Sequence, residues 1–117
     1  SLGVKTVLLV GPVPQFKPSL PSVYVRYGWN ENKIKLSQGL NQEIIKTSTL
    51  LDKKYEAKES YFTYISLFKE LCNLNGCQVV TEGRDLMLLD YGHLSPSGSV
   101  YVANIIHSKL IENNLVR

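Results

Sequence analysis

The chain has 117 residues and a mass of 13.2 kDa, which limits it to one domain over residues 1–117. Hydrophobic residues make up 44% of the sequence and charged residues 20%, as in globular proteins and unlike disordered chains. The net charge of +3 is mild and forms no basic stripe, so no nucleic-acid partner is predicted. The longest apolar runs, at residues 7–10 and 86–89, are too short to cross a bilayer.

The first predicted element is a strand at residues 5–10, which ends abruptly at a Gly-Pro pair. Its uninterrupted apolar run is typical of a parallel strand that helices cover on both faces. Residues 11–33 then hold four of the five prolines, and we expect a long irregular connection there. A connection of this length either forms a wall of a substrate site or simply packs against the surface of the domain. The sequence leaves both interpretations open.

The middle of the chain predicts a helix followed by a second strand. Residues 36–54 carry apolar side chains at helical spacing, with Ser37 as the expected N-cap and lysines near the C-terminal end. Residues 60–66 alternate and are rich in aromatic and β-branched side chains, which favours a strand. A short helical turn is expected over residues 67–71. The order of strand, helix and strand indicates an α/β fold.

The two cysteines, Cys72 and Cys77, flank a short loop with a turn-forming Asn-Gly pair. This spacing leaves three states open, namely a disulfide, two free thiols, or half of a metal site. We predict the disulfide, whose closed loop constrains the unfolded chain by about 2 kcal/mol. No metal is predicted, because the only histidines that could supply nitrogen ligands are His93 and His107. His93 is better explained by the Asp90-x-x-His93 string described below. A further turn is expected at residues 82–85.

The end of the chain predicts a helix that starts at Ser95-Pro96 and runs to about Asn113. A serine hydroxyl caps the first turn, and proline at the first helical position loses no hydrogen bond. The apolar stripe is expected at Val102, Ala103, Ile106 and Leu110, with Ile105 at its edge. The residues expected off this stripe are Tyr101, Lys109 and a solvent-facing His107.

The segment most informative about chemistry is Asp90-Tyr91-Gly92-His93, just before the final helix. An aspartate three residues before a histidine, in a turn loosened by glycine, can accept the imidazole N–H and leave the other nitrogen free as a base. This is the base half of a Ser-His-Asp triad, and general-base assistance contributes on the order of 100- to 10,000-fold. The spacing alone also allows a structural role, in which Asp90 caps a turn and His93 packs beside the helix.

Two longer strings carry a family resemblance: Val-Leu-Leu-Val-Gly-Pro-Val-Pro at residues 7–14 and Asp-Tyr-Gly-His-Leu-Ser-Pro-Ser-Gly at residues 90–98. They resemble the C-terminal half of the SGNH hydrolase-like domains attached to acyltransferase 3 membrane proteins. The resemblance implies a doubly wound, flavodoxin-like, three-layer α/β sandwich with a parallel sheet. It also implies that Asp90 and His93 belong to a Ser-His-Asp triad, and paired cysteines are familiar in this group.

The resemblance further implies a function. Similar proteins transfer acyl groups, commonly acetyl, onto sugar hydroxyls of bacterial surface glycans such as the lipopolysaccharide O-antigen, and no cofactor is implied. The expected location is the periplasmic face of the inner membrane, as a soluble domain of an integral membrane protein. The expected partners are an acyl donor, a glycan acceptor and the membrane acyltransferase domain of the same parent chain.

The chain departs from the family pattern in its nucleophile. The family serine lies in a Gly-Asp-Ser turn, and its oxyanion donors are a glycine and an asparagine from later blocks; none of these motifs occurs here. We therefore expect a C-terminal fragment with the N-terminal blocks missing, inactive by itself. Ser95 and Ser97 are poor replacements, because they belong to the cap and first turn of the helix. The open edge of the first strand predicts self-association as a homodimer.

Two non-enzymatic alternatives stay open at this point. The chain could be a glycan-binding relative that uses Tyr24, Tyr27 and Trp29 as stacking surfaces. It could also be a flavodoxin-like interaction domain in which Asp90 and His93 lie apart. The absence of a glycine-rich phosphate loop of either common type speaks against the second alternative.

Overall fold

The structure, a computed structural model, describes residues 3–28, 33–56 and 62–115. Trp29 and the first two residues of the predicted strand at 60–66 lie outside these ranges. In chain order the elements are β1 (Val7–Val10), α1 (Leu20–Val23), the π-helical turn η1 (Tyr24–Gly28), β2 (Lys33–Ile34), α2 (Gln42–Lys54), β3 (Phe62–Ile65), α3 (Leu67–Leu71), β4 (Cys72–Asn73), β5 (Gly76–Gln78) and α4 (Pro96–Glu112).

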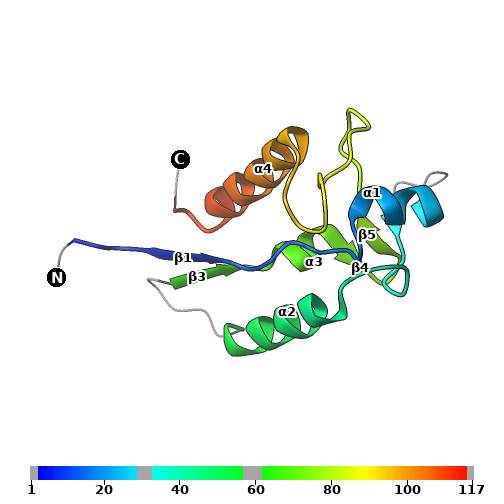
Figure 1. The fold of residues 1–117 in the computed structure, drawn as a ribbon. Helices are drawn as coiled ribbons and strands as arrows, with labels where there is room; N and C mark the ends of the chain where they lie inside the picture. The colour runs from blue at the N-terminus through cyan, green and yellow to red at the C-terminus, as the bar shows by residue number, and fades with distance from the viewer. Residues whose placement is uncertain (1–2, 29–32, 57–61, 116–117) are drawn as a thin grey trace.

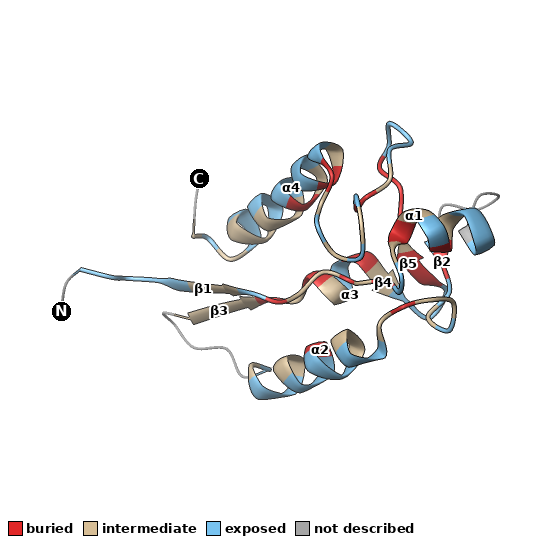
Figure 2. Ribbon diagram, viewed as in Figure 1, coloured by how far each residue is buried: buried red, intermediate tan, exposed pale blue. Residues whose placement is uncertain are grey.

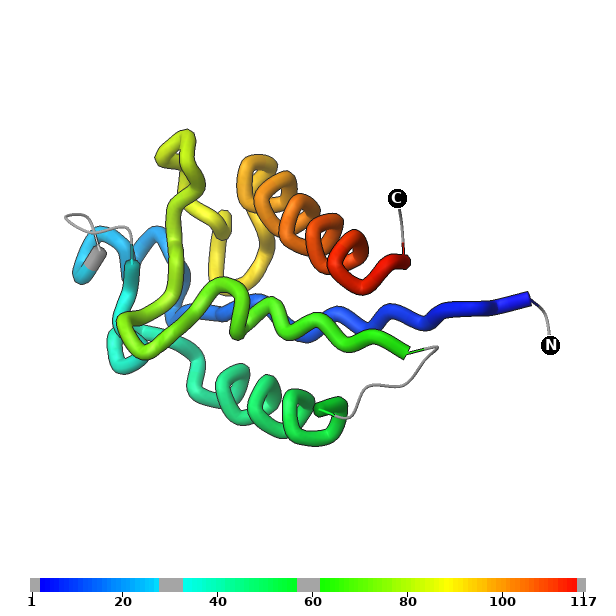
Figure 3. Tube along the Cα trace, turned by 180° about the vertical axis from the view of Figure 1, so that it is seen from behind, coloured from blue at the N-terminus to red at the C-terminus, as the bar shows by residue number. Residues whose placement is uncertain are grey.

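The centre of the fold is a parallel pair of strands between two helices. β1 and β3 run in the same direction, with Val7 opposite Phe62 and Val10 opposite Ile65. Helix α2 lies on one face of this pair and α4 on the other, as both views of the chain show (Figures 1 and 3). The predicted α/β sandwich of three layers with a parallel sheet is thus confirmed.

Strand β1 is less covered than its apolar sequence predicts. Val7 is 41% exposed and Val10 is 36% exposed, and the N-terminal part of the strand is open to solvent (Figure 2). The reason is that, within the described part of the chain, β1 pairs only with β3. Helices thus flank both faces as expected, but they leave Val7 and Val10 partly exposed, and within the described ranges one edge of β1 has no neighbouring strand.

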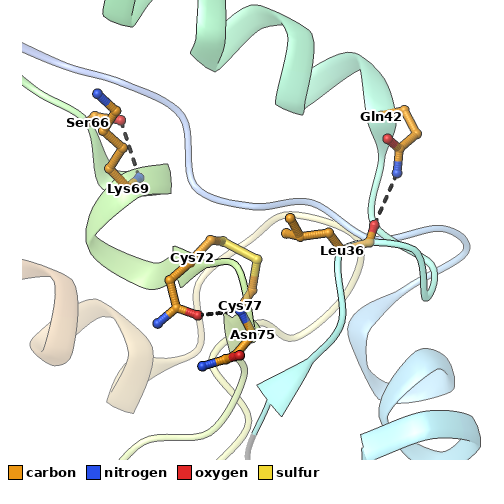
Figure 4. Close-up of a disulfide and its surroundings, with 8 residues drawn as sticks. Leu36, Gln42, Ser66, Lys69, Cys72, Asn75 and Cys77 are labelled. Atoms are coloured by element: carbon orange, nitrogen blue, oxygen red, sulfur yellow. Dashed lines mark hydrogen bonds between the residues drawn. A yellow bond between two sulfur atoms is a disulfide. The ribbon is translucent and has the colours of Figure 1, made fainter.

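A second, antiparallel sheet was not predicted from the sequence. It has the order β2-β5-β4, and its β4–β5 hairpin places Cys72 directly opposite Cys77. The two cysteines form the predicted disulfide (Figure 4). Gly76, the first residue of β5, has a φ of +120°, and a Cβ there would overlap the carbonyl oxygen of Ile34 in β2. Glycine is thus required for the hairpin to pack against β2.

Helix α2 begins later than predicted. Its N-cap is Asn41, whose side chain accepts a hydrogen bond from the N–H of Glu43, so the expected cap at Ser37 is wrong. The residues before it are tied to the segment after β1 instead. Leu40 forms an isolated β-bridge with Phe16, and the N–H of Asn41 donates to the carbonyl of Gln15. These long-range bonds hold residues 36–41 outside the helix, which therefore begins at Gln42.

The connection over residues 11–33 is more ordered than predicted. Within its described part it contains α1 and the turn η1, so the expectation of an irregular segment is wrong. Phe16, Leu20 and Val23 are among the most buried residues of the core, with 2%, 0% and 4% exposure. This burial supports the interpretation that the connection packs against the domain. Residues 16–20 also contact the loop that carries Asp90.

Other local predictions are confirmed, including α3, the turn at residues 82–85 and the last helix. Along α4, however, the buried face differs from the predicted stripe. Val102 is buried as expected, whereas Ala103 is exposed. Tyr101 faces inward and its hydroxyl donates to Gln78 at 2.9 Å, and Lys109 is half-buried by an ion pair with α3. Among the helices of the described ranges, none has the length and apolar sequence that a bilayer crossing requires.

Candidate active site

A short hairpin-like turn carries the Asp90-x-x-His93 string. Leu88 and Leu94 form an isolated antiparallel bridge, and the N–H of Leu89 donates to the carbonyl of His93 at 2.9 Å. These two contacts close the turn at its base. The aspartate and the histidine are therefore placed at its tip, ahead of helix α4.

The tip of the turn is also bound to the segment that follows β1. The N–H of Phe16 donates to the carbonyl of Tyr91, and the N–H of Leu20 donates to the carbonyl of Asp90, both at 2.9 Å. Since this segment leaves the carboxyl end of β1, the turn lies at the edge of the parallel sheet where open α/β folds bind ligands (Figure 1). The buried Phe16 and Leu20 make this support rigid.

Asp90 binds both the backbone of the turn and the imidazole. Its Oδ1 atom accepts hydrogen bonds from the N–H groups of Gly92, at 2.9 Å, and His93, at 2.8 Å. Its Oδ2 atom lies 2.7 Å from Nδ1 of His93. The two backbone N–H groups and the imidazole together lower the pKa of Asp90 to about 2 from 3.8. The carboxylate is thus ionised at neutral pH and accepts a hydrogen bond from the Nδ1–H group of His93.

The other side of the His93 ring is open. Of the structural alternative, one part holds, because Asp90 caps the turn through the N–H groups of Gly92 and His93. The other part does not, because the His93 side chain is 69% exposed and is not packed beside the last helix. Because Nδ1 donates to Asp90, Nε2 carries no proton in the neutral ring and can accept one. No residue in the described ranges makes a hydrogen bond to Nε2. The interaction-domain alternative, in which Asp90 and His93 lie apart, is wrong for this geometry.

The helix that follows the turn is fixed by its cap. Ser95 is 5% exposed, and its hydroxyl donates to the carbonyl of Leu86 at 2.6 Å and accepts from the N–H of Gly98 at 2.9 Å. The hydroxyl of Ser97 donates to Asp85 at 2.6 Å. Both hydroxyls therefore have structural partners. Neither hydroxyl forms a hydrogen bond to His93.

Comparison with known proteins identifies the family of the chain. The family model "SGNH domain (fused to AT3 domains)" matches residues 1–108. The chain belongs to this SGNH family. Its structure is similar to the periplasmic domain of the lipopolysaccharide acetyltransferase of Salmonella ser. Paratyphi A, with a TM-score of 0.72 and 27% sequence identity. The match covers 91% of this chain and 42% of that one. No curated protein is significantly similar.

This SGNH domain shows neither a nucleophile for His93 nor a metal site in its described part. No serine in the described ranges forms a hydrogen bond to the imidazole. No group of three or more His, Cys, Asp or Glu side chains in these ranges could hold a metal ion. The chemistry that the described residues offer is proton transfer at Nε2 of His93, with Asp90 as its orienting carboxylate.

Of the three aromatic residues of the glycan-binding alternative, the structure describes two. Tyr24 is half-buried and packs against the core. Tyr27 is 40% exposed, and the guanidinium of Arg26 lies 5.1 Å from its ring centroid. Trp29 lies outside the described residues. Tyr27 is thus a surface residue, whereas Tyr24 contributes to the packing of the core.

Two residues near the turn that carries His93 were missed by the sequence analysis. The ring of Tyr91 meets the imidazole edge-on, with centroids 5.4 Å apart and planes at 73°. The side chain of Gln15 lies against Gly92, where a Cβ would come within 3.0 Å of its Nε2 atom. The only sequence signal for Gln15 was its place just after the first strand, and Tyr91 was seen only as a spacer in the Asp-x-x-His string.

Proposed function

We propose that this SGNH domain supplies the histidine and aspartate of a serine-dependent O-acyltransferase. The enzyme transfers an acyl group, in the first instance acetyl, to sugar hydroxyls of a surface glycan such as the lipopolysaccharide O-antigen. The observation that carries the proposal is the 2.7 Å contact between Asp90 Oδ2 and His93 Nδ1, with the opposite side of the ring open. Membership of a family fused to AT3 domains supports it, as does the likeness to a lipopolysaccharide acetyltransferase domain.

The nucleophilic serine lies outside this chain, in a preceding part of the parent protein. In the first step, Nε2 of His93 accepts the serine proton while the serine oxygen attacks the acyl carbonyl of the donor. The resulting imidazolium protonates the leaving group, which departs and leaves an acyl-serine. Asp90 stabilises the imidazolium through the charge-assisted bond to Nδ1. The same bond fixes the tautomer that His93 needs at the start of each step.

In the second step, Nε2 accepts the proton of a sugar hydroxyl, whose oxygen attacks the acyl-serine. Transfer of that proton to the serine oxygen releases the sugar ester and restores the serine. The oxyanion donors also belong to the part of the domain outside this chain. We propose that the membrane acyltransferase domain of the same parent protein delivers the acyl group and that the reaction takes place on the periplasmic side.

The test is acetylation of the glycan by the full-length parent protein. His93→Ala removes the base, and we expect at least a 100-fold loss of rate. Asp90→Asn keeps the size of the side chain but favours the wrong tautomer, and we expect a loss of similar order. His107→Ala is the matched control, because His107 is exposed on α4 and takes no part in the site. Wild-type rates in the His93→Ala protein would rule out the proposal.

A further inference from the structure

The ring of Tyr91 is held next to the reacting histidine. Its side chain is half exposed, and the edge-on contact with His93 places the two ring centroids 5.4 Å apart. The backbone at this position is fixed, because the Tyr91 carbonyl accepts from the buried Phe16. The structure therefore presents a half-exposed aromatic ring in contact with the imidazole.

The reaction geometry limits what can lie on that surface. A hydroxyl that gives its proton to Nε2 must come within about 2.6–3.2 Å of this nitrogen. A sugar ring that carries such a hydroxyl then lies within contact distance of an aromatic ring that touches the imidazole. The C–H face of a pyranose is apolar, and an exposed tyrosine offers an apolar body with a polar tip.

Gln15 adds a polar group on the neighbouring side of the turn. Its side chain rests against Gly92, and its backbone carbonyl is held by the N–H of Asn41 at 2.7 Å. The carboxamide offers two donors and one acceptor, and no hydrogen bond to a residue of the described ranges occupies it. A side-chain amide beside an aromatic ring provides both kinds of contact that a sugar makes.

We infer that Tyr91 and Gln15 form the acceptor subsite, in which the ring stacks on the pyranose that receives the acyl group and the amide binds its hydroxyls. This inference rests on the proposed function and deepens it. It assigns the acceptor, a sugar ring, to the surface formed by Tyr91 beside His93 and by Gln15 against Gly92.

The experiment compares transfer with hydrolysis in the full-length protein. The acyl-serine reacts with the sugar acceptor or with water, and only the first reaction needs the acceptor subsite. We expect Tyr91→Ala and Gln15→Leu each to lower the transfer-to-hydrolysis ratio about 3- to 10-fold, mainly through a higher KM for the acceptor. We expect Tyr91→Phe to recover most of the transfer lost in Tyr91→Ala, because the ring is retained.

Tyr27→Ala is the matched control, because it removes an exposed tyrosine elsewhere on the surface. An equal fall of transfer and hydrolysis in Tyr91→Ala would show that Tyr91 only positions His93 and would overturn the inference. An unchanged acceptor KM in both variants would also overturn it. Retention of both reactions in His93→Ala would instead reject the proposed function, so the two failures are distinguishable.

Discussion

Gly98, in the first turn of α4, packs directly on the carbonyl oxygen of Met87, so closely that a Cβ at this position would overlap it. The contact lets the N-terminus of the helix approach residues 86–88, while Ser95 bonds to the carbonyl of Leu86. Together they set the position of the turn that carries His93. The glycine three residues after the cap is thus part of the support of the site.

Replacing Gly98 with alanine should destabilise the domain. The added methyl group meets backbone and not a flexible side chain, so we expect a loss of about 1–3 kcal/mol in the free energy of unfolding. Urea denaturation followed by circular dichroism measures it. Ser99→Ala is the matched control, one position along the same helix and exposed. Equal stability of the two variants would contradict the close packing.

The carboxyl group of Asp90 should titrate well below its ordinary range. Its pKa of about 2 results from the N–H of Gly92, the N–H of His93 and the imidazole. Because this pKa lies below the unfolded value, the contribution to stability is present above pH 3.8 and is lost as the pH falls toward 2. Carbon-13 NMR of the carboxyl groups, recorded between neutral and strongly acidic pH, measures it.

His93→Ala refines this titration. The variant removes the imidazole but keeps both backbone N–H groups, which are the larger causes of the shift. We therefore expect the pKa of Asp90 to rise in the variant and still remain below 3.8. A wild-type protein in which Asp90 titrates at or above its ordinary value would contradict the geometry of the turn.

The disulfide should stabilise the hairpin that supports α4. It joins β4 to β5, and Gln78, one residue after Cys77, accepts the hydroxyl of Tyr101. We expect reduction to lower the free energy of unfolding by about 2 kcal/mol, from the entropy of the short closed loop. Denaturation with and without reductant measures the effect. The double variant Cys72→Ser/Cys77→Ser is the control and should not respond to reductant.

The open edge of β1 should make the isolated chain self-associate. Val4 and Val7 are 73% and 41% exposed beside an edge that has no partner strand in the described ranges. Unpaired apolar edges recruit another strand, and a lysine on such an edge opposes pairing. We expect light scattering to show a dimer of the 117-residue chain and a shift toward monomer in Val7→Lys. A wild-type chain that stays monomeric at high concentration would contradict the prediction.

The parts of the site that the sequence predicted correctly depend on neighbours in the chain. Asp90 and His93 are three residues apart, and the cap of α4 by Ser95 is equally local. The disulfide between Cys72 and Cys77 also closes over a short separation. In each case the partners are held close by a turn or a helix start, so residue type and spacing were sufficient to find them.

The errors come from long-range partners. Tyr101 and Lys109 face inward on α4 because Gln78 and Glu70, from distant segments, bind their polar ends. From helical periodicity alone, such amphipathic side chains are predicted to face solvent. The same limit hid the second sheet, whose strands of two or three residues are defined by pairing and not by composition. It also hid Gln15, which reaches the site only through the fold.

The most direct test of the central claim is chemical rescue of His93→Ala in the full-length parent protein. If the imidazole of His93 is the base that Asp90 orients, the variant should lose at least 100-fold in glycan acetylation, and added free imidazole should restore part of the rate. His107→Ala should show neither the loss nor the rescue. A His93→Ala protein that acetylates the glycan at the wild-type rate without imidazole would contradict the account.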